Sequence, residues 1–235
     1  MMSPMREPDE ALALLGRSRL FKHADPADLT SLLQEARWRK YSADSYVFRE
    51  DDPADHMLIV AGGQVKISRS TEGGTEVVFA VLGPGDALGE LGALEEGATR
   101  SADAKALTET KCLVIHRPAL VRFLNAHSEA MWGVVNVLTT YIHTKDEAFA
   151  DLAVRDIPGR VARKLLDLAS AGGKPVGQGT QLTLQLSQST LAGLVGASRE
   201  NVNRALSRFA TLGLISLDRG RITLLRPEDL RRRGE

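Results

Sequence analysis

The chain has 235 residues and carries 30 lysine and arginine residues against 30 aspartate and glutamate residues, so its formal net charge at pH 7 is zero. With 43% hydrophobic and 26% charged residues, the composition disfavours long disorder and a membrane span of about 20 apolar residues. The one cysteine, Cys112, excludes disulfide frameworks, cysteine-rich zinc sites and iron–sulfur clusters held by several thiolates. We expect no secretory signal, because Met1 to Leu15 lacks a basic start followed by an apolar run.

The zero net charge is the sum of two unlike halves. Residues 1–153 hold 16 basic and 23 acidic side chains, a difference of −7, whereas residues 154–235 hold 14 and 7, a difference of +7. Phosphate contacts depend on locally clustered lysine and arginine, so the basic half favours a polyanion partner. A chance asymmetry between two solvated surfaces is the alternative interpretation.

The acidic half begins with helical spacing and continues as short strands. Leucines in Pro26–Glu35 recur at helical spacing, and Asp25 is a candidate N-cap for that helix. Short β-branched runs separated by glycine turns then predict a sandwich or barrel. These runs are Tyr46–Phe48, Met57–Val60, Val65–Arg69, Val77–Leu82 and Cys112–Ile115.

A heptad pattern follows the strands and predicts a long helix, with Ser128 as its candidate N-cap. Its seam positions are Met131, Val135, Leu138, Ile142, Lys145, Phe149 and Leu152. A repeat of about 3.5 residues favours pairing with the same helix of a second copy, and packing within a single chain is the alternative. The segment Asp156–Gly159 interrupts this helix and predicts an interdomain hinge.

The basic half predicts a winged helix-turn-helix. An amphipathic helix over Arg160–Ser170 precedes a strand suggested by the alternation of Leu182, Leu184 and Leu186. Two short helices follow, and the apolar runs on either side of Asp218–Gly220 predict a β-hairpin. Helices closed by a small hairpin have the outline of a winged DNA-binding domain.

The segment Gln188–Leu206 carries the most specific pattern in the chain. A helix-turn-helix needs a small residue where its helices touch and a residue that tolerates positive φ at the turn, and Ala192 and Gly196 supply these. Ser198 is a candidate N-cap for the second helix. The apolar residues expected to face inward are Leu191, Leu194, Val195, Val202 and Leu206.

The second helix of this pattern exposes polar side chains in its first two turns, the turns that enter the major groove of DNA. They are Arg199, Glu200, Asn203 and Arg204. An arginine can donate two hydrogen bonds to guanine, and a carboxylate can accept one from cytosine. The alternative is an ordinary solvated helix face.

Gly89–Gly92 and Arg100–Ser101 suggest an effector pocket between two predicted strands. A buried cyclic phosphate needs a guanidinium that bonds two oxygens and a hydroxyl that completes its coordination, and Arg100 and Ser101 fit that need. A ribose hydroxyl needs a carboxylate acceptor and a close backbone, which Glu90 and Gly89 provide. On the residues alone, an ordinary ion pair between Arg100 and Glu90 would be favoured, and the nucleotide pocket is what the family resemblance given next implies.

Two motifs, Gly89–Ala102 and Gly196–Leu206, resemble the cyclic AMP receptor protein (CRP/FNR) family of bacterial transcription regulators, and the resemblance extends from Leu20 to Leu225. It implies an α+β protein with an N-terminal β-roll, the cyclic-nucleotide-binding jelly roll, over residues 1–127. A dimerisation helix over 128–153 and a winged helix-turn-helix DNA-binding domain over 154–235 would follow.

By this resemblance the chain is a cytoplasmic homodimer that binds cyclic AMP and a palindromic double-stranded DNA site with TGTGA-like halves, with RNA polymerase as a further partner. The implied ligand-binding residues are Gly89, Glu90, Leu91, Arg100, Ser101 and Lys145. The implied DNA-binding residues are Gln188, Ser198, Arg199, Glu200, Asn203, Arg204, Arg219 and Arg221. The resemblance implies neither membrane insertion nor catalysis.

One departure from the family concerns the base of the nucleotide. Family members that bind cyclic AMP meet the adenine with hydroxyl residues on the long helix, where this chain has Lys145 and Asp146. Lys145 also falls on the apolar seam, so it must extend to solvent, pair with an acid such as Asp146 of the partner subunit, or meet a ligand.

Two further hypotheses therefore stand beside the first. One is a regulator of the same fold that binds DNA without a nucleotide or with another effector, and the other is a cyclic-nucleotide-binding module of a kinase or channel. We expect no haem, since haem-binding members place ligands where this chain has Gly89–Leu91. We also expect no metal, because the histidines show no metal-ligand spacing along the chain; they are His23, His56, His116, His127 and His143.

Overall fold

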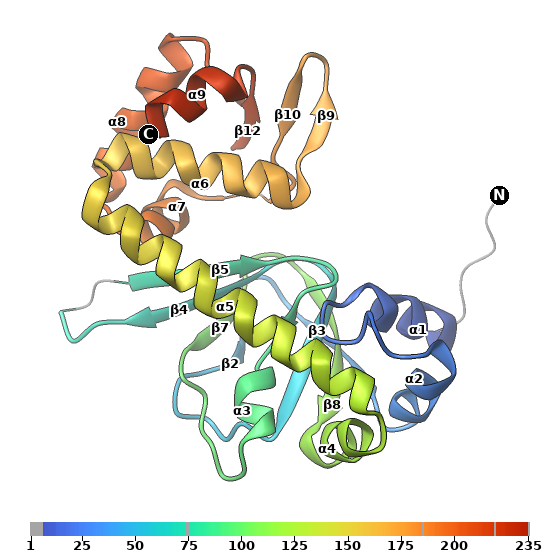
Figure 1. Ribbon diagram of the computed structural model, residues 1–235. Coiled ribbons are helices and arrows are strands. Elements are labelled where there is room, and N and C mark those ends of the chain that lie inside the picture. The colour runs from blue at the N-terminus through green and yellow to red at the C-terminus, as the bar shows by residue number, and fades with distance from the viewer. Residues whose placement is uncertain (1–6, 74–75, 185, 219, 235) are drawn as a thin grey trace. The chain divides into compact units, whose positions relative to one another are not determined.

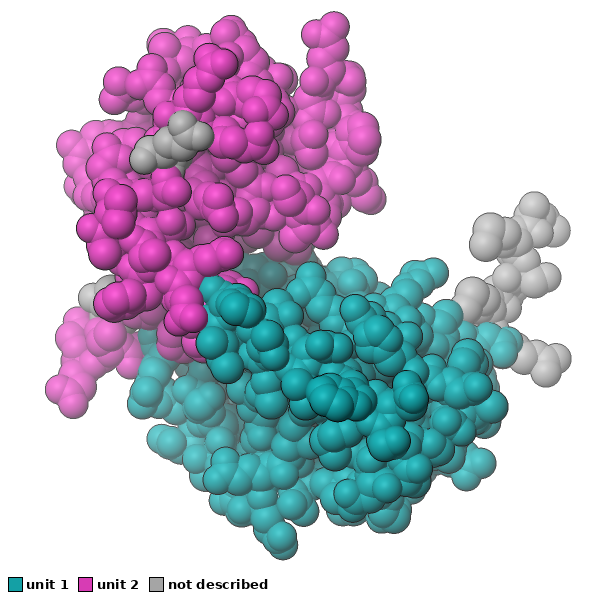
Figure 2. Space-filling model, in the orientation of Figure 1, with its two compact units in different colours: residues 1–69, 80–143 teal, residues 70–79, 144–235 magenta. Residues whose placement is uncertain are grey.

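The computed structural model describes residues 7–73, 76–184, 186–218 and 220–234. The chain divides into two compact units, one made of residues 1–69 and 80–143 and the other of residues 70–79 and 144–235 (Figure 2). Helix α5, which runs from Ser128 to Val154, contributes to both units. The elements are labelled in Figure 1, and each unit is described separately below.

Antiparallel strands and four helices make up most of the first unit, and strands β4 and β5 continue beyond it into residues 70–79. The strands are β1 (Arg37–Tyr41), β2 (Tyr46–Phe48), β3 (His56–Gly62), β4 (Val65–Ser70), β5 (Glu76–Leu82), β6 (Ala87–Leu88), β7 (Asp103–Ala106) and β8 (Thr110–His116). They form two four-stranded sheets, ordered β1-β8-β3-β6 and β2-β7-β4-β5. The helices are α1 (Glu7–Arg17), α2 (Pro26–Leu33), α3 (Glu90–Leu94) and α4 (Arg117–Ala126).

Strands β3 and β8 show why this sequence forms a sheet with both faces covered. Side chains alternate along a strand, so Leu58 and Val60 of β3 pack into the core that both sheets share. Met57 and Ile59 point the other way and pack with side chains of α1, α2, α4 and α5. Because both faces are buried, β3 reads as an unbroken apolar run rather than an alternating one.

The second unit contains the helix-turn-helix. Its helices are α6 (Ile157–Gly172), α7 (Gln188–Val195), α8 (Arg199–Thr211) and α9 (Pro227–Gly234). Its sheet, ordered β11-β12-β10-β9, consists of β9 (Lys174–Val176), β10 (Gly179–Gln181), β11 (Ile215–Asp218) and β12 (Arg221–Leu224). Fully or nearly fully buried side chains of its core come from α6, α7 and α8, through Val161, Leu191 and Phe209, and from the sheet and α9, through Leu224 and Leu230.

Several sequence predictions are confirmed at the level of single residues. Asp25 caps α2, accepting a hydrogen bond from the Ala27 backbone N–H at 2.8 Å. The long helix ends at Val154, as the interruption at Asp156–Gly159 predicts, and Asp156 caps α6 by accepting from the Gly159 N–H, a role that the sequence did not predict. The predicted hairpin is present as β11 and β12, which pair antiparallel from Ile215↔Leu224 to Asp218↔Arg221.

The strand predicted from Leu182, Leu184 and Leu186 is wrong. The ladder between β10 and β12 ends where the Leu182 N–H donates to the Ile222 carbonyl at 2.9 Å. The next residue, Thr183, donates its hydroxyl to the Gly172 carbonyl at 2.7 Å, so the chain leaves the sheet. Leu182 and Leu186 are nevertheless buried, which explains an alternating pattern without a strand.

Candidate effector pocket and DNA-reading surface

The predicted effector residues, Gly89–Gly92 with Arg100 and Ser101, are called the cassette below. They lie around the N-terminus of α3. Gly89, the N-cap of this helix, has φ +74°, and a Cβ there would lie 2.3 Å from Arg100 Nη1. A Cβ on Gly92 would lie 2.5 Å from the Ala54 Cβ. Only glycine satisfies both the backbone conformation and the close approach at residue 89. The structure thus brings Gly89, Glu90 and Arg100 together, as the sequence predicts.

Arg100 is a buried cation with an incomplete set of partners. Its side chain donates to the Gly89 carbonyl at 3.0 Å and to the His56 carbonyl at 2.6 Å. Its guanidinium carbon lies 4.2 Å from the centre of the Phe48 ring. Nε is buried without a hydrogen-bond partner, and the guanidinium forms no ion pair with the described residues. Burial lowers the pKa of Arg100, since removal from water disfavours the charged form.

Glu90 is the matching buried anion, only 3% exposed. Burial raises the pKa of Glu90, whereas hydrogen bonds from its own backbone and from Tyr141 oppose that rise. Its Oε2 atom is buried and has no hydrogen-bond partner. A buried acceptor without a donor costs free energy, so a ligand hydroxyl that donates to Oε2 would be favourable. The site therefore holds one unsatisfied acceptor beside one unsatisfied donor.

Tyr141 is a site residue that sequence reasoning missed. It lies on α5, and its hydroxyl bonds the Glu90 carboxyl, while burial raises the pKa of Tyr141. The available signal was an aromatic residue with a polar tip on the long helix, off the heptad seam. Through this bond the cassette contacts the long helix directly.

The remaining predicted ligand residues are not part of this buried pair. Leu91 is 46% exposed on α3, and Ser101 is exposed beside Arg100. Lys145 belongs to the second unit, where its ammonium nitrogen lies 5.5 Å from the centre of the Phe79 ring. Phe79 is itself 50% exposed, so Lys145 is held by an aromatic face rather than by an apolar core.

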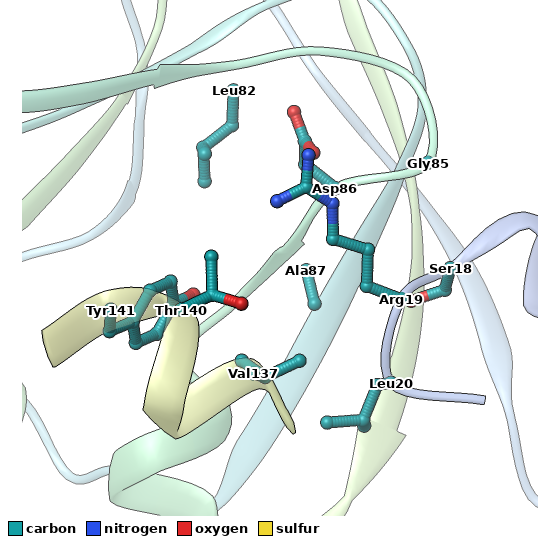
Figure 3. Close-up of a pocket in the computed structure, with 10 residues that line it drawn as sticks. All are labelled: Ser18, Arg19, Leu20, Leu82, Gly85, Asp86, Ala87, Val137, Thr140 and Tyr141. Atoms are coloured by element: carbon teal, nitrogen blue, oxygen red, sulfur yellow. The ribbon is translucent and has the colours of Figure 1, made fainter. Parts of the chain in front are cut away.

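A cavity of about 120 Å³ lies beside the cassette in the first unit. Figure 3 shows Val137, Thr140 and Tyr141 entering it from α5, with Asp86 and Arg19 at another side. Ser18, Leu20, Leu82, Gly85 and Ala87 complete its lining. It is smaller than the roughly 300 Å³ of an ordinary ligand site, and neither Glu90 nor Arg100 lines it. The cavity and the predicted effector residues share Tyr141, which lines the cavity and bonds Glu90.

The helix-turn-helix has the local geometry that its sequence requires. Gly196 ends α7 with φ +61°, a conformation that glycine adopts at little cost. Ser187 caps α7 by accepting from the Thr190 N–H at 3.0 Å, and Ser198 caps α8 by accepting from the Asn201 N–H at 3.2 Å. The predicted capping role of Ser198 is confirmed.

The first two turns of α8 present the predicted base-reading side chains to solvent. Arg199, Glu200, Asn203 and Arg204 are all exposed. Gln188 of α7 donates to the Asn203 Oδ1 at 3.0 Å, and Arg204 bonds the Asn201 Oδ1. Arg199 and Glu200 form no hydrogen bond or ion pair with the described part of the chain. These two side chains are free to meet base edges.

The wing and the C-terminal segment add basic residues. Arg221 is exposed at the start of β12, and Arg219 lies outside the described residues. The run Arg231–Arg233 lies in helix α9, whose Leu230 is fully buried. Arg231 is also paired with Glu228 at 2.6 Å, which offsets part of its charge.

A β-domain with a buried cation–anion cassette, a long helix and a winged helix-turn-helix define a DNA-binding regulator with a sensor domain. Comparisons with known proteins agree: the cyclic nucleotide-binding domain matches residues 38–127, and the Crp-like helix-turn-helix domain matches residues 159–233. The CRP-like cAMP-activated global transcriptional regulator of Mycobacterium tuberculosis is 34% identical over 221 residues, which cover 94% of this chain and 98% of that protein. The chain belongs to the CRP/FNR family of transcription regulators.

Solved structures support the same fold. FixK2 from Bradyrhizobium japonicum has a TM-score of 0.76 at 22% identity, covering 85% of this chain and 98% of its own. The c-di-GMP responsive global regulator CLP of Xanthomonas campestris has a TM-score of 0.72 at 26% identity, covering 85% and 99%.

These domains and relatives are those of transcription regulators and not of enzymes, and they do not support the hypothesis of a kinase or channel module. None of the helices that the structure describes has the length and apolar character of a bilayer-spanning segment.

Proposed function

We propose that this protein is a homodimeric regulator whose binding to a palindromic DNA site is controlled by cyclic AMP. Residues 1–127 act as the sensor, residues 128–153 as the dimerisation helix and residues 154–235 as the DNA-binding domain. The observation that carries the effector half of this proposal is Arg100, a buried guanidinium without a carboxylate partner in the described chain.

A cyclic nucleotide fits the chemistry of the cassette. Arg100 would hold the phosphate with two hydrogen bonds, and the exposed Ser101 hydroxyl beside it would add a third. Glu90 Oε2, which is buried and has no hydrogen-bond partner, would accept a hydrogen bond from the ribose hydroxyl. Gly89 leaves the space that the guanidinium occupies, and the exposed Leu91 side chain would cover the ligand.

The homodimer proposal rests on the exposed face of α5. Met131, Val135, Leu138, Ile142, Phe149 and Leu152 are between 38% and 76% exposed, although each is apolar. The opposite face is buried in the first unit through Ala130, Gly133, Val134 and Val137. An exposed stripe at heptad spacing, apolar at every seam position except Lys145, is what two copies of this helix would bury between them.

The DNA half of the proposal assigns the recognition role to α8. Arg199 would donate to guanine and Glu200 would accept from cytosine, with Asn203 and Arg204 completing the contacts to a TGTGA-like half-site. The capped N-terminus near Ser198, together with Gln188, Arg219 and Arg221, would contact phosphates and set the orientation. Two such helices in a dimer would sit one DNA turn apart, about 34 Å. RNA polymerase is the proposed further partner.

Transmission from sensor to reader would pass through Tyr141. A ligand that bonds Glu90 and Arg100 would compete with the Tyr141 hydroxyl for the Glu90 carboxyl. Because Tyr141 lies on α5, this change would favour one position of the helix over another. The effector shifts the population only by its difference in affinity between the two states of the dimer.

Calorimetric titration of the nucleotide-free protein with cyclic AMP, and separately with cyclic GMP, tests this function. We expect one saturable site per protomer and a preference for cyclic AMP. No heat of binding at millimolar concentrations of either nucleotide would refute the effector assignment.

A second candidate function has its own observation. Lys145 and Asp146 stand where cyclic-AMP-binding members carry hydroxyl residues, and one similar structure is a c-di-GMP responsive regulator. Under this alternative the protein binds DNA with another effector or with none. Tight, specific DNA binding by nucleotide-free protein, unchanged when cyclic AMP is added, would favour it.

A further inference from the structure

The side chains of Asp55, His56 and His116 form a cluster in the first unit. None of these side chains has a role in the function proposed above. His56 begins β3 and His116 ends β8, and these two residues are direct partners in the antiparallel register. Their rings lie 5.7 Å apart between centroids, tilted by 55°. Asp55 immediately precedes β3, and its Oδ1 lies 2.6 Å from His56 Nδ1.

This cluster has the donor set of a transition-metal site. One ligand atom from each of the three residues lies within 4.8 Å of the other two. Two imidazoles and one carboxylate suit Zn²⁺, which binds nitrogen and carboxylate oxygen at about 2.0–2.2 Å and leaves a fourth position to water. Ligand atoms that share such an ion are roughly 3.4 Å apart. The Asp55–His56 pair, now at 2.6 Å, must therefore separate slightly, and the wider spacings, which reach at most 4.8 Å, must shorten.

The exposure of two of the three side chains leaves room for these shifts. The His56 side chain is 16% exposed and fixed by its surroundings, whereas the Asp55 side chain is 68% exposed and His116 is exposed. The two solvent-facing groups can therefore move relative to the one that is held.

We propose that Asp55, His56 and His116 form a binding site for a divalent transition-metal ion of the Zn²⁺ class, completed by water. The ion takes the place of the hydrogen bond that now joins the carboxylate to the imidazole. The site adjoins the effector cassette, because the His56 carbonyl accepts a hydrogen bond from Arg100 Nη2 at 2.6 Å. His56 would thus bind the metal ion through its side chain, while its backbone carbonyl bonds the Arg100 guanidinium.

The chain order hides this site from sequence patterns. His56 and His116 are 60 positions apart, and only the pairing of β3 with β8 makes them neighbours. The expectation that the histidines have no metal-ligand spacing describes the chain correctly, but it does not extend to the folded protein.

The test uses the full chain, stripped with a chelator and titrated with Zn²⁺ alone, so its result does not depend on the effector or on DNA. We expect one ion per protomer by equilibrium dialysis, and an X-ray absorption spectrum with only nitrogen and oxygen ligands that include imidazole. His116→Ala and Asp55→Asn alter exposed side chains and should each weaken binding at least tenfold. His23→Ala, which changes another exposed histidine of the same unit, should leave binding unchanged.

Two results would overturn the site. One is zinc binding at well below one ion per protomer in the unsubstituted protein. The other is an equal loss of binding in His23→Ala and His116→Ala, which would indicate nonspecific association with surface histidines. Circular dichroism of each variant checks that the fold is retained.

Discussion

The sensor cassette and the recognition helix both depend on arginine and glutamate, yet they hold these residues in opposite environments. Arg100 and Glu90 are each 3% exposed and keep unpaired polar atoms inside the protein. Arg199 and Glu200 are exposed and form no hydrogen bond or ion pair with the described chain. A buried charge with unsatisfied hydrogen-bonding atoms destabilises the folded protein until a ligand bonds those atoms. An exposed charge is hydrated and costs little free energy in the absence of a partner.

The difference shows where selectivity resides in each region. In the sensor, a ligand that lacks a phosphate or a ribose hydroxyl would leave buried groups unsatisfied, so discrimination is enforced by desolvation. In the reader, the wrong base costs only the hydrogen bonds that it fails to make. Substitutions should therefore have larger effects in the sensor than in the reader.

The largest effect should come from the helix that links the two regions. Ile142→Asp places a carboxylate on the exposed seam of α5 in both copies, and burying it should weaken dimerisation by about 3–5 kcal/mol. Analytical ultracentrifugation measures the change. His143→Asp, the neighbouring exposed position off the seam, is the matched control and should stay dimeric. Equal behaviour of the two variants would mean that α5 does not form the dimer seam.

A comparable loss should follow from removing the buried cation. Arg100→Leu deletes the guanidinium that we propose binds the phosphate, and it should cost about 2–5 kcal/mol of cyclic AMP affinity, measured by calorimetry. Arg69→Leu is the control, since Arg69 is a 58% exposed arginine on β4 and should bind nucleotide normally. If Arg100→Leu retained full affinity, the cassette would not be the phosphate site.

A smaller and sequence-dependent effect is expected on the recognition helix. Arg199→Ala should cost about 1–3 kcal/mol on a duplex with the cognate guanine and much less on one where that guanine is replaced. Fluorescence anisotropy with both duplexes measures this difference. Arg208→Ala, an exposed arginine in the last turn of α8, should not discriminate between them. A uniform loss on all sequences would assign Arg199 to phosphate contacts instead.

The smallest effect concerns stability without ligand. Glu90→Gln removes a buried carboxylate and should stabilise the nucleotide-free protein by roughly 1 kcal/mol while weakening nucleotide binding. Because burial raises the pKa of Glu90 above its unfolded value, the unsubstituted protein loses stability as pH rises from about 4.5 through that folded pKa. The advantage of Glu90→Gln should therefore grow with pH in thermal melts. An advantage that stayed constant between pH 5 and pH 8 would contradict the buried, titrating carboxylate.

Elements that depend on residues close together in the chain could be predicted from the sequence, whereas strand β1 could not. The caps Asp25 and Ser198 and the turn at Gly196 follow from single residues, because their hydrogen bonds and backbone angles are formed by near neighbours. Strand β1 was missed because it is an edge strand with the sequence Arg-Trp-Arg-Lys-Tyr, in which basic residues replace the apolar alternation.

The candidate sites divide in the same way. The sequence predicted Gly89, Glu90 and Arg100 because they are close along the chain and form a recognisable motif. It did not predict the bond from Tyr141 to Glu90 or the pairing of His56 with His116, since each depends on contacts between segments more than 50 residues apart. Such contacts are set by the packing of helices and the register of strands, which no local pattern encodes.

The most direct test of the account measures the linkage between the two regions. The affinity for a palindromic TGTGA-type duplex is measured with and without saturating cyclic AMP, and the affinity for cyclic AMP with and without the duplex. The account predicts the same enhancement in both directions, on the order of 5–150-fold, and its loss in Arg100→Leu. DNA affinity that cyclic AMP does not change, or an enhancement that survives Arg100→Leu, would contradict it.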